Sequence, residues 1–253
     1  MMKELRYFLK DSIRKTVDFS ATRQSLGYPP PPAEKPAPGD TAVIPLPRPG
    51  ELKGICGITL EEAISRRRSV RQYSSLPVSL EELAFLLWAT QGFRTTPGPG
   101  GGFRTVPSAG CRHPFETYLA VFRVEGLERG LYRYLPVEHG LIFLGCPENL
   151  EARTAQAAMG QPFAGKAAVT FIWTAVPART EWRYGEASVK VIALDAGHVC
   201  QNLYIACQAV GTGTCAIAAY DQEAADGLIG VDGEEEFVVY MAPVGKTGNF
   251  TRS

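Results

Sequence analysis

The sequence predicts an α+β fold, in which helices and short strands do not follow the strand–helix–strand order of a parallel sheet. Two observations support this prediction. Apolar residues spaced by three and four predict a helix of about five turns that ends at Gly211. Short strand-like runs joined by turn residues predict an antiparallel meander. The apolar residues of the long helix are Ile192, Ala196, Val199, Leu203, Ala206 and Val210.

Residues 1–53 are predicted to form an arm outside the globular domain, which we place at residues 54–253. Nine of the 19 prolines lie between Pro29 and Pro49. Such a run favours extended polyproline geometry and disfavours a helix or a central strand. We therefore expect a spacer, or a tail that wraps over the surface.

Two helices with capping boxes open the globular domain. Thr59 with Glu62, and Ser79 with Glu82, have the spacing in which an N-cap hydroxyl and a glutamate satisfy each other's backbone amides. The following residues 93–107 are rich in glycine, proline and arginine. We expect this loop to lie outside the core.

The remaining elements are predicted from apolar runs and the turn residues between them. A helix near residues 148–158 separates the meander from a buried strand, and the chain closes with a further strand after the long helix. The predicted strands are Tyr118–Val124, Gly130–Tyr134, Leu141–Leu144, Ala167–Val176 and Phe237–Pro243.

The charges exclude some classes of partner. The 26 lysines and arginines balance 26 aspartates and glutamates, whereas a nucleic-acid binder needs a basic excess to displace counterions from phosphates. The longest uncharged apolar run, about residues 167–178, is far shorter than the roughly 20 residues of a membrane helix. We expect no nucleic-acid partner and no membrane span.

The cysteines and histidines do not predict a metal site. The six cysteines form no CxxC pair, and the three histidines are scattered along the chain. Reduced thiols are typical of a cytoplasmic protein, and the amino terminus lacks the continuous apolar stretch of a signal peptide. We therefore expect a cytoplasmic location.

The densest positive charge is the segment RRRSVR at residues 66–71. Four guanidiniums in six residues repel one another, and arginine's planar fork binds phosphate and carbonyl oxygens in pairs. The segment thus predicts an anion site. The alternative is a solvated helix end, where cations complement the negative pole of the helix dipole.

Other segments indicate little when taken alone. PSAG at residues 107–110 and the small residues within 211–221 could bring the backbone close to a ligand, but they also suit turns and packing. Lys246 is a lone cation after the last strand. Asp195 and His198 on the long helix predict a satisfied, buried polar cluster.

Taken in order, RRSVRQY, PSAG-CRHPFETYLAV, DAGHVCQNLYIACQAVG, AIAAYD and PVGK resemble the nitroreductase family of flavin enzymes. More narrowly, they resemble the branch that includes the SagB-type azoline dehydrogenases of peptide natural-product pathways. The resemblance covers about residues 59–246. It implies an α+β homodimer with a central sheet flanked by helices, a long central helix and FMN at the subunit interface. It also implies NADH or NADPH as a possible donor and a small molecule as substrate.

The resemblance further implies a set of cofactor-binding residues, which share the positions of the family's motifs. They are Arg67, Arg68, Ser69 and Arg71 for the phosphate, ribityl chain and pyrimidine edge; Pro107, Ser108, Ala109 and Gly110 in the loop that the other subunit lays on the ring; Ile217, Ala218 and Ala219 beside flavin N5; and Gly245 with Lys246 near the phosphate.

Three departures from the family pattern bear on function. Cys111 stands where many nitroreductases have asparagine, and Ala218-Ala219 stand where they have Glu-Gly. The azoline dehydrogenases carry a catalytic Lys-Tyr pair, of which this chain keeps Tyr184 but has Arg183 in place of the lysine. Because arginine stays protonated, it cannot act as a general base. Tyr184 remains a candidate for a substrate contact or a proton donor.

The sequence therefore predicts an FMN-dependent oxidoreductase that passes hydride or electrons from a reduced nicotinamide, or another donor, to a small organic acceptor. Two alternatives stay open: an azoline dehydrogenase that acts on modified peptides, and a flavin-binding protein without catalytic function. Substrate specificity is expected to reside in loops at residues 93–105 and 177–186.

Overall fold

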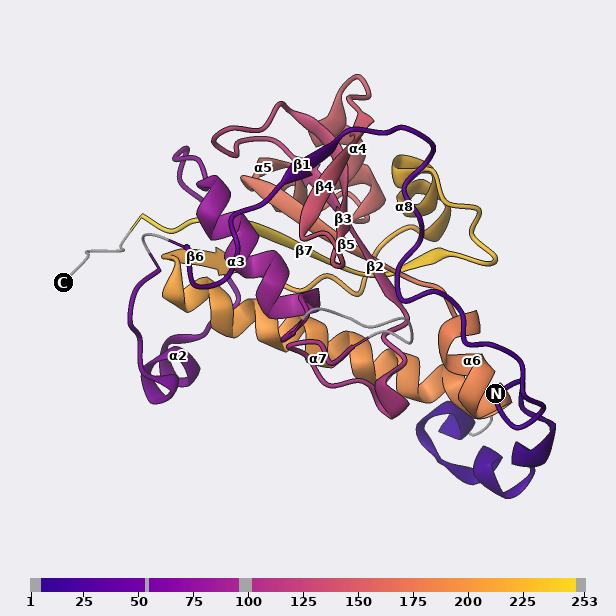
Figure 1. Ribbon diagram of the computed structural model, residues 1–253. Coiled ribbons are helices and arrows are strands. Elements are labelled where there is room, and N and C mark those ends of the chain that lie inside the picture. The colour runs from indigo at the N-terminus through magenta and orange to yellow at the C-terminus, as the bar shows by residue number, and fades with distance from the viewer. Residues whose placement is uncertain (1–5, 53–54, 96–101, 249–253) are drawn as a thin grey trace.

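The computed structural model describes residues 6–52, 55–95 and 102–248. In this part of the chain one antiparallel sheet has seven strands in the order β1-β4-β3-β2-β5-β7-β6, which confirms the predicted α+β class (Figure 1). The strands are β1 (Val43–Pro45), β2 (Phe115–Val121), β3 (Gly130–Leu135), β4 (Gly140–Gly145), β5 (Val169–Ala175), β6 (Thr212–Thr214) and β7 (Phe237–Lys246).

Helices cover both faces of the sheet. The predicted long helix is α7 (Ser188–Ala209), which crosses one face beside α3 (Leu80–Gln91) (Figure 1). Side chains alternate along each strand, so Leu119 packs with that layer while its neighbour Tyr118 packs with the opposite one. The opposite layer contains α4 (Leu150–Ala157), α5 (Phe163–Lys166) and α8 (Gln222–Ile229).

Both predicted capping boxes are present. The Thr59 hydroxyl accepts the amide of Glu62 at the start of α2 (Leu60–Arg66), and the Ser79 hydroxyl accepts that of Glu82 at the start of α3. In each box the glutamate carboxylate accepts the N-cap amide in return. These caps fix where the two helices begin. The arginine segment starts at Arg66, the last residue of α2.

Two of the expected loops are more ordered than predicted. Residues 178–184 form α6 (Ala178–Tyr184), followed by a 3₁₀ turn, η5 (Gly185–Ala187), that leads into α7. In the other loop Arg104 and Val106 are buried, so the prediction that it lies outside the core is wrong for its second half. Residues 96–101 of this loop lie outside the described residues.

The arm lies along the globular domain. It begins with the 3₁₀ turns η1 (Arg6–Leu9), η2 (Ser12–Lys15) and η3 (Phe19–Ala21), and ends at β1, which pairs with β4 at the edge of the sheet. Between them, the proline-rich run offers unpaired carbonyls. The Ala33 carbonyl accepts a hydrogen bond from Arg104 Nη2 at 2.6 Å, and the Pro36 carbonyl accepts one from Arg133 Nη2 at 2.8 Å. The predicted boundary at residues 53 and 54 lies outside the described residues.

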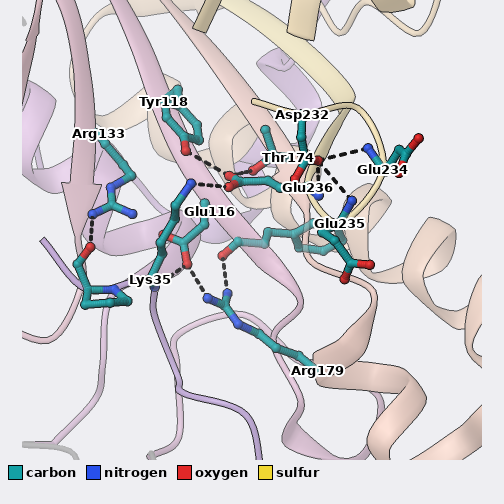
Figure 2. A network of polar contacts seen from close by, with 12 residues as sticks. Lys35, Glu116, Tyr118, Arg133, Thr174, Arg179, Asp232, Glu234, Glu235 and Glu236 are labelled. Atoms are coloured by element: carbon teal, nitrogen blue, oxygen red, sulfur yellow. Dashed lines mark hydrogen bonds and ion pairs between the residues drawn. The ribbon is translucent and has the colours of Figure 1, made fainter. Parts of the chain in front are cut away.

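Lys35 links the arm to two buried carboxylates (Figure 2). Its amide donates to Glu116 Oε1 at 2.7 Å, and its Nζ lies 2.7 Å from Glu236 Oε2. Glu116 also pairs with Arg179, and both partners are almost fully buried. Buried carboxylates are stable only when paired and hydrogen-bonded, so the arm contributes to the packing of this region.

Glu34 makes the stability of the arm region pH-dependent. Burial, opposed by a hydrogen bond from the Val137 amide and reinforced by Glu138 and Glu116, raises the pKa of Glu34 to about 8. Between pH 4.5 and 8 the folded chain holds a proton that the unfolded chain has lost, so the free energy of unfolding falls as pH rises.

We expect Glu34→Gln to make the free energy of unfolding less dependent on pH, since glutamine does not ionise. Urea unfolding of the wild type and the variant at pH 5, 6.5 and 8 measures the effect, and Glu51→Gln, an exposed glutamate of the same arm, is the control. An unchanged slope in Glu34→Gln would contradict the assignment.

Candidate functional site

The arginine segment runs beside the sheet after α2. Ser69 forms a parallel bridge with Thr214, and the Val70 amide donates to the Thr214 carbonyl at 2.9 Å. Two glycines allow this close approach. A Cβ on Gly213 would lie 2.6 Å from Val70 Cγ2, and one on Gly245 would lie 2.8 Å from the Tyr73 ring. The backbone of the segment is thereby fixed against β6 and β7.

The segment exposes guanidiniums that carboxylates do not neutralise. Arg68 and Arg71 are exposed and Arg67 is half-buried, and none of the three takes part in an ion pair within the described part of the chain. Pockets of about 440 and 660 Å³ lie beside Arg68, which lines both together with Thr247, and Arg71 lines the larger one. This concentration of uncompensated charge suits a small anion such as a phosphate group.

Tyr204 of α7 connects the arginine segment to the chain that follows β6. Its hydroxyl lies 3.0 Å from Ser69 Oγ, accepts the Ala216 amide at 2.8 Å, and has the Arg67 guanidinium 5.3 Å from its ring. Tyr204 was not predicted as a site residue, because it follows Leu203 in an apolar stretch and carries no motif of its own.

The segment 217–219 differs along its length in whether its backbone amides are hydrogen-bonded. Ile217 exchanges two hydrogen bonds with Met241, at 2.8 and 3.1 Å, so its own amide is occupied. Ala218 and Ala219 are exposed, and their amides make no hydrogen bond with the described residues. Of the three residues predicted for this role, the structure therefore leaves two with amides that could bind a ligand.

Ala218 lines a cavity of about 680 Å³ between α7 and β7. Its walls are mainly apolar, with Ile192 and Ala196 from α7 and Tyr240 from β7. Glu181 from α6 also lines it, and burial followed by repulsion from Glu235 raises the pKa of Glu181. A cavity of this size and lining suits a flat organic molecule.

The PSAG loop is fastened to α7 by Asp195. The Ser108 hydroxyl donates to Asp195 Oδ2 at 2.6 Å, and the Ala109 amide donates to the same carboxylate at 3.1 Å. Burial raises the pKa of Asp195, and these two hydrogen bonds oppose the shift. The predicted polar cluster on α7 is wrong in one respect: His198 is half-exposed and lies 3.7 Å from Asp195.

Tyr184 lies against this loop. A Cβ on Gly110 would come within 2.6 Å of Arg183 Cδ and 2.7 Å of the Tyr184 hydroxyl. Gly110 also has a φ of 57°, in the left-handed region that favours glycine. The structure thus brings together Tyr184 and the loop, which are 74 residues apart in the sequence (184 − 110).

Lys246 is not a free cation. Its Nζ donates to Oε1 of Glu82, which is almost fully buried, and also donates to the Val210 carbonyl at 3.1 Å. The lysine therefore neutralises a carboxylate of the second capping box, and it is the neighbouring Thr247 that lines the arginine pockets.

The predicted site residues form two groups in one chain. Tyr204 joins the arginine segment and the 217–219 segment, whereas Asp195 joins the PSAG loop and, through that loop, Tyr184. Tyr204 lies nine positions after Asp195 in α7, which is roughly 14 Å along the helix axis. A single chain does not bring the two groups together at one point.

Comparison with known proteins connects these features. The model of the nitroreductase family matches residues 64–246. A candidate nitroreductase of Methanocaldococcus jannaschii is 36% identical over 209 residues, which cover 82% of this chain and 98% of that protein.

None of the helices in the described ranges combines the length and apolarity that a membrane span requires.

Two solved structures have a similar fold. A candidate nitroreductase of Ralstonia eutropha JMP134 matches with a TM-score of 0.68 and 25% identity, over 88% of this chain and all of that one. A candidate nitroreductase of Exiguobacterium sibiricum 255-15, solved in complex with FMN, matches with a TM-score of 0.55 and 15% identity. The second match covers 78% of this chain and 93% of that one.

Proposed function

Because the chain belongs to the nitroreductase family, and is thus an oxidoreductase, we propose that it binds FMN and reduces a small organic acceptor with electrons from NADH or NADPH. The observation that carries the proposal is that the chain has two kinds of donor. These are the guanidiniums of Arg68 and Arg71, which no carboxylate neutralises in the described structure, and the backbone amides of Ala218 and Ala219, which make no hydrogen bond there. The FMN complex of the Exiguobacterium protein supports the choice of flavin.

The donors of this chain fit the parts of FMN. Arg68 and Arg71 have the charge for its phosphate, and the Ser69 hydroxyl can bond its ribityl chain. Ala218 and Ala219 present amide donors to the edge of the ring, beside a cavity with apolar walls. When bound, FMN supplies hydride transfer at its N5 position. The protein binds and orients it, stabilises charge on the ring with cations and excludes water from the cavity.

We further propose a homodimer in which each site takes both groups of residues. The PSAG loop and the arginine segment are far apart along α7 in one chain, so a second copy has to supply the loop. Leu194 of α7 is 54% exposed and is therefore available for contact with a second copy.

The experiment that tests the function is anaerobic reduction of the purified protein. We expect the visible flavin absorbance to disappear when NADH or NADPH is added, and to return when a nitroaromatic or a quinone follows. Bound flavin that neither nicotinamide reduces, or that no acceptor reoxidises faster than oxygen does, would instead support a flavin-binding protein without catalytic function.

Tyr184 tests the azoline dehydrogenase alternative. Because Arg183 cannot act as a base, we expect Tyr184→Phe to leave kcat for nitroaromatic reduction within about threefold of the wild type and to raise KM modestly through its contact with the loop. Steady-state kinetics with Tyr28→Phe, a half-exposed tyrosine of the arm, as control measure both constants. A loss of kcat of about a hundredfold or more in Tyr184→Phe alone would favour proton transfer by this tyrosine.

A further inference from the structure

A separate pocket of about 330 Å³ lies between the arm and the end of the PSAG loop. Prolines 30–32 of the arm line it on one side, and Arg104, Cys111, Arg112 and His113 supply its polar groups. Its volume is at the lower end of the range for small-molecule sites. Neither the proposed flavin contacts nor the acceptor cavity uses these side chains.

Arg104 is a buried cation without a hydrogen-bonded anion. The residue is 4% exposed, and its guanidinium donates at 2.6 Å to each of two neutral oxygens, Gln91 Oε1 and the Ala33 carbonyl. Its Nε has no partner among the described residues. The nearby carboxylate of Glu116 is engaged by Arg179. A buried guanidinium with a free N–H is costly to the fold unless a ligand satisfies it.

Arg112 adds a second charge to the same pocket. Its guanidinium stacks on the Trp182 ring at 4.8 Å, and its Nε donates to the Gly110 carbonyl at 3.0 Å. Both of these partners are neutral. Within the described ranges no carboxylate forms an ion pair with Arg112, so its charge is also available to a ligand.

A thiol stands beside these charges. Cys111 Sγ lies 3.4 Å from His113 Nε2, and both residues have left-handed backbone conformations, with φ of 58° and 47°. Burial, together with Arg104, Arg112 and Arg179, lowers the pKa of His113 to about 3. The imidazole is therefore neutral at physiological pH, and the two guanidiniums set the charge of the pocket.

We propose that this pocket binds a small carboxylate beside the Cys111 thiol, with Arg104 and Arg112 as the groups that hold the carboxylate. Arginine's planar fork matches a carboxylate in pairs of hydrogen bonds, and both Arg104 and Arg112 line the pocket. An electrophile that carries a carboxylate is thus placed against Cys111, whereas a neutral one of the same shape is not.

Alkylation of the thiol tests this directly in the full chain. Iodoacetate and iodoacetamide have nearly the same shape and react in the same way: the sulfur–carbon bond forms, iodide leaves, and the thiol proton goes to solvent. Rates at each cysteine are read by peptide mass spectrometry. Cys56, which is half-buried like Cys111 and makes no hydrogen bond with an arginine among the described residues, is the internal control.

We expect the iodoacetate-to-iodoacetamide rate ratio at Cys111 to exceed that at Cys56 about tenfold, as one charge-assisted hydrogen bond provides. Arg112→Gln is expected to bring the ratio toward that of Cys56. In the wild type, sodium acetate at constant ionic strength is expected to slow the reaction of Cys111 with iodoacetamide and to leave Cys56 unaffected. Equal ratios at the two thiols, or a Cys111 that neither reagent alkylates, would overturn the proposal.

Discussion

Arg68→Ala is expected to raise the dissociation constant for FMN by about 10- to 100-fold. Arg68 lines both pockets beside the arginine segment and has no carboxylate partner in the described structure. A hydrogen bond from a charged donor contributes about 1.5–3 kcal/mol, which corresponds to this range of affinity. Because the backbone of the segment is fixed by Thr214, loss of one exposed side chain is expected to leave the fold intact.

Quenching of FMN fluorescence on titration into the apoprotein measures the effect. Arg153→Ala is the matched control, since Arg153 is an exposed arginine of α4 that lies outside these pockets. An Arg68→Ala protein that binds FMN as tightly as the control would mean that the phosphate is bound elsewhere.

Arg179→Met is expected to lower the free energy of unfolding by about 3–5 kcal/mol. Arg179 and Glu116 are both almost fully buried, and methionine has a similar length but no charge. The substitution leaves the Lys35 amide as the one remaining hydrogen-bond donor to the carboxylate of Glu116 among the described residues. An uncompensated buried charge is among the most destabilising changes a single substitution makes.

Denaturant unfolding of the variant and the wild type gives this difference. Arg129→Ala breaks an exposed ion pair with Glu151 and is expected to cost no more than about 1 kcal/mol, because solvent screens that pair. Similar losses in the two variants would show that the Glu116–Arg179 pair is not shielded from solvent as the structure indicates.

The parts of the fold that depend on local sequence were predictable. The capping boxes at Thr59 and Ser79 determine where two helices begin, and the apolar spacing along 192–210 identifies α7. Helix α6 was missed because it is a single short helix with mixed polarity, and β1 was missed because it ends at Pro45 and lies within the proline-rich run. Such elements are stabilised by tertiary contacts that have no local pattern.

In the candidate site, too, residues with a local sequence pattern were predicted, and residues that act through distant contacts were not. The arginine segment was found because it carries unusual charge, and the PSAG loop because it matches a motif of the family that the chain resembles. The residues that hold them in place, Tyr204 and Asp195, were not assigned these roles, since their partners lie 135 and 87 positions away in the sequence. The pairing of Lys246 with Glu82 was missed for the same reason.

The measurement that tests the central claim most directly is the flavin content and mass of the purified protein. Absorbance of flavin released on denaturation gives its amount per chain, and light scattering gives the mass of the particle. We predict close to one FMN per chain in a particle of twice the 27.5 kDa chain mass. A colourless monomer that takes up no added FMN would contradict the proposed function and the shared site alike.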